Sequence, residues 1–186
     1  SMHEDAVTTL IDQDADLADH VIEQDNQVDR LYAMLSRHFQ RSLVSLQETE
    51  KLELNQSELY EYQTTARQLE RVADHAEKIA TLATRFEDPL PEDFVDEIET
   101  KAETSRRIVE QATSAIIGDA DIETAHSALD DRDELTAELE ALERELHERD
   151  ISESHLIALT LDSLTRTAEY GGNIAETALQ TAAREK

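Results

Sequence analysis

The sequence contains no cysteine, and this absence excludes disulfide bonds, thiolate-bound metals and thiol catalysis. Glycine and proline are scarce as well, with three and two copies among 186 residues. A β-rich fold needs more of both for its tight turns, so the composition favours long helices. Tryptophan is absent, and apolar residues make up 39% of the chain, which suffices for a lean core in one large domain or two small ones.

Long apolar runs are also missing. No stretch approaches the roughly 18 apolar residues that a membrane span needs. No signal peptide is visible at the start of the sequence. We therefore expect a cytoplasmic protein that does not insert into a membrane.

Positive charge is sparse, because 17 lysines and arginines stand against 44 aspartates and glutamates, for a net charge of −27. Such a surface repels nucleic acid phosphates, so we expect no direct nucleic acid binding by this segment. Salt screens the mutual repulsion of so many acids, and the composition therefore indicates a high-salt cytoplasm, as in a halophilic archaeon. An ordinary acidic helical protein is the alternative.

Apolar residues recur at helical spacing in six stretches, which predicts an all-α fold. The predicted helices cover 4–11, 16–46, 57–85, 92–117, 120–149 and 152–180. Asn55 and Glu58 have the spacing of a capping box, and Ser152 is placed to cap the last helix. Pro89 and Pro91 end the third helix and mark the clearest boundary in the chain.

The two halves of the chain resemble each other. Residues of the third helix recur 95 positions later: Leu69, Arg71, Ala73, Ile79, Ala80 and Ala83 match Leu164, Arg166, Ala168, Ile174, Ala175 and Ala178. We therefore predict two tandem three-helix bundles, over 1–88 and 89–186. The first predicted helix is much shorter than its counterpart over 92–117, so we expect the natural chain to begin upstream of residue 1.

Gly171 and Gly172 fall inside the last predicted helix. Each costs about 1 kcal/mol in a helix interior relative to alanine. We therefore expect another element to pack closely against them.

Two pairs of acidic residues stand out in the first unit. Asp25 and Asp29 are four residues apart on the second predicted helix, and Asp25 interrupts its apolar stripe. Glu70 and Asp74 have the same spacing on the third helix, beside a stripe rich in alanine. Carboxylates suit hard cations, or iron and manganese, so the four residues form a candidate metal site. Solvated carboxylates at the rim of the stripes are the alternative.

Other helical functions fit the sequence less well. A di-iron bundle needs Glu-x-x-His on two helices, and only Glu123 with His126 has that spacing. A histidine phosphotransfer domain remains an alternative, because His75 and Lys78 have its His-x-x-Lys spacing, but Ile79 follows where a small residue is usual. The sequence has no glycine-rich phosphate loop and no nucleophile motif.

The stretch Leu69-Glu70-Arg71-Val72-Ala73-Asp74-His75-Ala76, followed by Ile79-Ala80, resembles the signature of PhoU proteins, regulators of phosphate uptake. Asp25-x-x-x-Asp29 resembles the companion motif on the preceding helix, and 164–176 resembles a second copy. The resemblance implies tandem three-helix bundles, each able to hold metal ions between two acidic motifs. It assigns the first site to Asp25, Asp29, Glu70 and Asp74.

The second copy departs from this pattern. Thr165 stands in the place of Glu70 and Ala137 in the place of Asp29, so only Asp133 and Glu169 remain as oxygen ligands. For the whole protein the resemblance implies a non-enzymatic regulator of phosphate uptake and phosphate signalling. It also implies a homodimer whose partners are a phosphate transporter, a sensor histidine kinase, or both. The bound metal would be iron, manganese, zinc or magnesium. A metal-free helical module for oligomerisation or partner binding is the alternative.

Overall fold

The computed structural model describes residues 1–44, 54–118, 122–149 and 151–184. All regular structure in these ranges is helical. The helices are α1 (Met2–Asp12), α2 (Ala15–Val44), α4 (Gln56–Ala83), α5 (Glu92–Ile117), α6 (Ile122–Glu148) and α7 (Ser154–Arg184). Each predicted helix is present, and the fold class is confirmed. Within these ranges no helix is long and apolar enough to cross a membrane.

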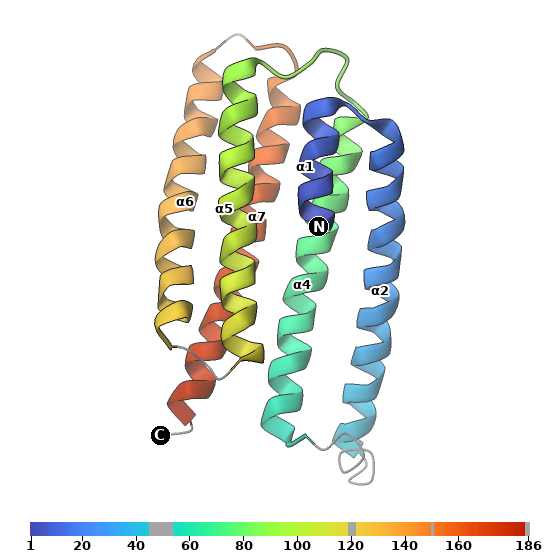
Figure 1. Cartoon of the computed structure of the whole chain (residues 1–186), viewed down its shortest axis with the longest axis vertical. Coiled ribbons are helices and arrows are strands. Elements are labelled where there is room, and N and C mark those ends of the chain that lie inside the picture. Colours follow the sequence, from blue (N-terminus) through green and yellow to red (C-terminus); the bar gives the residue numbers. More distant parts are fainter. Residues whose placement is uncertain (45–53, 119–121, 150, 185–186) are drawn as a thin grey trace.

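The helices form two three-helix bundles side by side. In Figure 1, α1, α2 and α4 lie together on one side, and α5, α6 and α7 on the other. The bundles meet where α4 packs along α7 and where α1 packs against α5. One apolar cluster of buried residues runs through both bundles, so a shared core joins the two halves.

Local side-chain interactions fix the helix ends. The Asn55 side chain accepts from the backbone N–H groups of Ser57 and Glu58, and the Glu58 carboxylate accepts from the Asn55 N–H at 2.7 Å, so the predicted capping box is confirmed. Asp14 accepts at 3.0 Å from the N–H groups of Asp16 and Leu17 at the start of α2. Four of the orphan donors of these two helix starts are thereby satisfied.

The predicted cap at Ser152 is wrong. The helix begins two residues later, and the Ser152 hydroxyl donates to the Asp88 carboxylate instead. Glu153 intervenes with a left-handed backbone, at φ 56°. Its carboxylate accepts from the N–H groups of Glu87 and Asp88, so the loop between the bundles holds this residue in place.

Gly171 and Gly172 lie inside α7 and are both buried. A Cβ at Gly171 would come within 2.8 Å of Ile108 Cγ2 and 3.1 Å of the Val109 backbone nitrogen on α5. A Cβ at Gly172 would come within 2.6 Å of Arg132 Cδ on α6. The predicted close packing is confirmed, and both partners belong to the second bundle.

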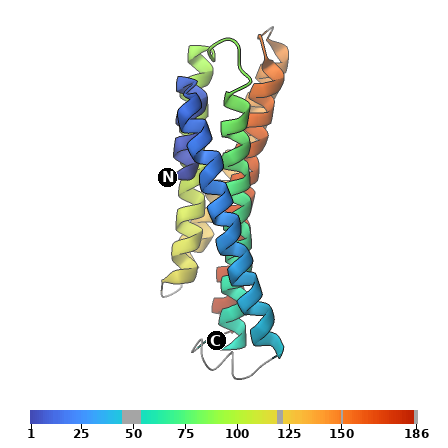
Figure 2. The same ribbon diagram turned by 90° about the vertical axis from the view of Figure 1, so that its right-hand side faces the viewer.

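The short first helix leaves part of the first bundle uncovered. α1 has 11 residues, whereas α2 has 30 and α5 has 26. Figure 2 shows α2 continuing well past the N-terminal end of α1. Beyond that end, apolar residues of the α2 stripe are only half-buried, among them Leu35 and Phe39. They line an apolar groove of about 390 Å³ together with Leu59 and Leu69 of α4.

Candidate metal site

Three of the four predicted acidic residues lie together between α2 and α4. Asp25, Asp29 and Asp74 each offer a carboxylate oxygen, and these oxygens all lie within 4.8 Å of one another. Asp25 and Asp29 come from successive turns of α2, and Asp74 from the adjacent helix α4. Asp25 is half-buried, whereas the other two are exposed. The cluster is thus open to solvent on one side and backed by the bundle on the other.

Among the three aspartates, Asp25 has the most strongly perturbed carboxylate. Its pKa is raised to about 6, first by burial and then by the negative charges of Asp29, Asp74, Glu77 and Glu70, in that order of effect. One of its oxygens, Oδ1, is buried without a hydrogen-bond partner. A buried carboxylate oxygen without a partner is unfavourable, and a bound cation would supply the missing interaction.

Burial and neighbouring negative charges also raise the pKa values of Glu70 and Asp74 on α4. Burial raises the pKa of Asp74, and the charge of Asp29 adds to this effect, while Arg71 opposes it. Burial likewise raises the pKa of Glu70, with Asp74 and Asp29 adding to it. Four carboxylates therefore repel one another across the α2–α4 interface.

Glu70 occupies a different position from the other three predicted residues. Its carboxylate is outside the group of oxygens within 4.8 Å, although it influences Asp25 through its charge. Glu77, which is not among the four predicted residues, also acts on Asp25 through its charge. Its spacing of three residues from Asp74 puts both on the same side of α4, and this spacing was a signal that could have identified it.

The residues present fit a cation. All donors are carboxylate oxygens, which suits hard cations such as Mg²⁺ or Mn²⁺, or iron, better than zinc. Within the ranges that the structure describes, no lysine, arginine or histidine forms an ion pair with Asp25, Asp29 or Asp74. In these ranges no ion pair therefore neutralises the three carboxylates, although the charge of Arg71 lowers the pKa of Asp74.

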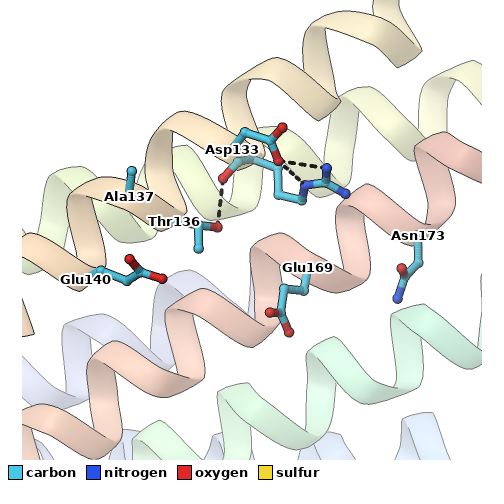
Figure 3. A pocket seen from close by; sticks show the side chains of 7 residues that line it. Asp133, Thr136, Ala137, Glu140, Glu169 and Asn173 are labelled. Carbon is cyan, nitrogen blue, oxygen red and sulfur yellow. Dashed lines mark hydrogen bonds and ion pairs between the residues drawn. The ribbon is translucent and has the colours of Figure 1, made fainter.

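The second bundle has a pocket at the equivalent place, with a volume of about 520 Å³. Figure 3 shows the Asp133 carboxylate bonded to the arginine beside it, and the Glu169 carboxylate pointing away from Asp133. Arg132 pairs with Asp133 at 2.7 Å and with Glu176 at 3.4 Å, and Arg166 pairs with Glu169 at 2.7 Å. Arginines thus neutralise both acids that the sequence left as ligands.

His75 of α4 lies against α7. Its ring centroid is 5.7 Å from that of Tyr170, and its Nδ1 atom is buried without a hydrogen-bond partner. Burial lowers its pKa, with the charge of Lys78 as the next cause. Lys78 itself pairs with Asp162 at 3.1 Å. The His-x-x-Lys spacing therefore places both residues in contacts with α7.

The fold and the acidic cluster together define a tandem three-helix bundle protein with a carboxylate site in its first bundle. Residues 1–83 match the family model of the PhoU domain. This match covers α1, α2 and α4, the three helices of the bundle that carries the cluster.

Two solved structures resemble the whole chain. PhoU from Pseudomonas aeruginosa superposes with a TM-score of 0.83 at 26% identity, covering 98% of this chain and 88% of that one. The phosphate transport system regulatory protein PhoU from Streptococcus pneumoniae superposes with a TM-score of 0.78 at 17% identity, covering 96% and 84% of the two chains. At the latter identity the likeness concerns the fold alone. No curated protein sequence matches this chain.

Proposed function

We propose that this protein is a non-enzymatic regulator of phosphate uptake and phosphate signalling of the PhoU type. It acts as a rigid acidic adaptor with two units, over 1–88 and 89–186. The observation that carries the proposal is the coincidence of two independent features in one unit. The residues that match the PhoU domain contain the carboxylate cluster of Asp25, Asp29 and Asp74.

The first unit binds a divalent cation or iron through these three residues, with Glu70 contributing charge or an outer contact. Magnesium, manganese and iron suit the all-oxygen donor set, and zinc suits it least. A bound cation would supply positive charge between α2 and α4. It would remove the repulsion among the carboxylates and hold the two helices together at this level of the bundle.

The partners of the adaptor are a phosphate transporter, a sensor histidine kinase, or both, and the protein is a homodimer. This part of the proposal is supported by the fold shared with the Pseudomonas aeruginosa PhoU, which extends over nearly the whole chain. The supporting feature of the chain itself is its large acidic surface, at a net charge of −27, which suits protein partners better than nucleic acid.

Deletion of the gene in its natural host tests the regulatory role. Phosphate uptake and phosphate-responsive expression are measured at low and high phosphate, and the deletion strain should fail to reduce uptake when phosphate is plentiful. Restoring the gene should restore the response. Identical uptake and expression with and without the gene at both phosphate levels would refute the proposal.

A further inference from the structure

A second polar pocket, of about 420 Å³, lies between α4 and α7 and has a different chemistry from the acidic cluster. Arg67 and Arg71 line it from α4, and Tyr170 and Asn173 line it from α7. The remaining lining residues are amide, tyrosine and threonine side chains, so every side chain of the pocket can donate a hydrogen bond. Among the residues that the structure describes, no carboxylate lines it, although acids outnumber bases by 44 to 17 in the chain.

Helix α4 presents acids toward α2 and two arginines toward α7, although the charge of Arg71 also acts on Asp74 and Glu70. Asp74 turns toward α2, where it meets Asp25 and Asp29. Arg67 and Arg71 are four residues apart, so they share one face of the helix, and this face lies against α7. Neither arginine forms an ion pair with an acid in the ranges that the structure describes. Apart from the hydrogen bond between Arg71 and Tyr170, their guanidinium groups thus keep donors for a ligand.

Contacts with α7 position the hydrogen-bond donors of Arg71 and Gln68 at the pocket. The Arg71 guanidinium carbon lies 5.8 Å from the centre of the Tyr170 ring, which is within cation–π distance. The Asn173 side-chain nitrogen donates to the Gln68 side-chain oxygen at 3.3 Å. Because the oxygen of Gln68 is thereby occupied, its amide nitrogen is the end left to donate to a ligand.

We propose that this pocket binds a phosphoryl group, as inorganic phosphate or as a small phosphate monoester. The guanidinium fork matches the tetrahedral oxygens of phosphate through paired, charge-assisted hydrogen bonds. A dianion is needed, because the overall charge of −27 opposes every anion that approaches and a single negative charge gains less from two arginines. The volume of the pocket leaves room beyond one phosphate ion, and the tyrosines offer ring faces to an organic group.

The site is tested by calorimetric titration of the purified full chain with inorganic phosphate and with AMP, at low ionic strength. Arg67→Gln and Arg71→Gln should each weaken the binding of both ligands about tenfold, which is the effect of one charge-assisted hydrogen bond. Arg144→Gln is the matched control, because it removes one exposed arginine of α6 whose hydrogen bond within the described ranges goes to the backbone oxygen of Glu140. This variant should change the affinity less than twofold, or about 0.4 kcal/mol.

The Arg71→Gln variant loses the contact with Tyr170 and could unfold for that reason. The Arg67→Gln variant keeps this contact, so it tests the site even in that case. Equal affinity for phosphate and AMP assigns the site to the phosphate ion alone. Tighter binding of AMP assigns it to a phosphate monoester. The proposal is overturned if neither ligand binds the wild-type protein, or if Arg67→Gln binds both as tightly as Arg144→Gln does.

Discussion

Replacing Asp25 with asparagine should stabilise the metal-free protein at neutral pH. In the folded protein the pKa of Asp25 is raised from 3.8 to about 6, first by burial and then by the charges of its acidic neighbours. This difference corresponds to about 3 kcal/mol of unfavourable free energy in the ionised form. Because the side chain is only half-buried, solvent screening reduces the expected cost to about 1–2 kcal/mol.

The destabilising effect of Asp25 should grow as the pH rises. The folded state holds the Asp25 proton more tightly than the unfolded state, so this group lowers stability as the pH rises from about 4 to about 6. Below that pH range Asp25 is protonated in both the folded and the unfolded protein, so it no longer lowers the stability. The stabilisation by Asp25→Asn should therefore be about 1–2 kcal/mol at about pH 7.5 and should shrink toward zero at about pH 4.

Urea denaturation followed by circular dichroism in the presence of a chelator measures this difference. Asp133→Asn is the matched control, because it changes the equivalent residue of the second bundle, which pairs with Arg132 at 2.7 Å. That variant should be neutral or destabilised by up to about 1 kcal/mol. If Asp25→Asn is less stable than the wild type at neutral pH, or if its effect is the same at both pH values, the reasoning about the cluster is refuted.

Three further predictions concern the acidic cluster and the two glycines of α7. Mn²⁺ affinity should fall about tenfold between about pH 7.5 and about pH 5, because a proton on Asp25 competes with the cation; a pH-independent affinity would exclude this residue as a ligand. Asp74→Asn should weaken Mn²⁺ binding more than Glu70→Gln does, and the reverse order in a metal titration would place Glu70 in the inner ligand set. Gly171→Ala should destabilise the protein by about 1–3 kcal/mol in thermal denaturation, because its Cβ meets the α5 backbone, whereas Gly172→Ala meets a flexible side chain and should cost less; equal stability losses would contradict this distinction.

The fold was predictable because long amphipathic stripes and scarce turn residues leave few alternatives. The α5 bounds agree with the predicted 92–117, and the capping box at Asn55 and Glu58 places the start of α4 to within one residue. The cap at Ser152 was not predictable, because a loop from the other bundle engages it and Glu153 through Asp88. Local spacing carries no information about such a tertiary contact.

The acidic cluster was predictable in part. Spacing along each helix identified the two pairs, but it could not fix which carboxylates face each other across the interface between α2 and α4. That depends on the relative rotation of the helices, which brings Asp25, Asp29 and Asp74 together and leaves Glu70 at the edge. The loss of acidic residues from the second copy, at Thr165 and Ala137, was visible in the sequence. The ion pair by which Arg132 neutralises Asp133 was not. Arg132 pairs with its sequence neighbour Asp133 and also reaches Glu176 on another helix, and spacing alone does not give these side-chain orientations.

The most direct test of the central claim is the stoichiometry of Mn²⁺ bound to the full chain at neutral pH, measured by equilibrium dialysis and elemental analysis. The wild-type protein should bind Mn²⁺, and a variant that combines Asp25→Asn, Asp29→Asn and Asp74→Asn should bind none, while Asp133→Asn should bind as the wild type does. A wild-type protein that binds no manganese, iron, zinc or magnesium above background would contradict the account. Equal binding by the wild type and the combined variant would do so as well.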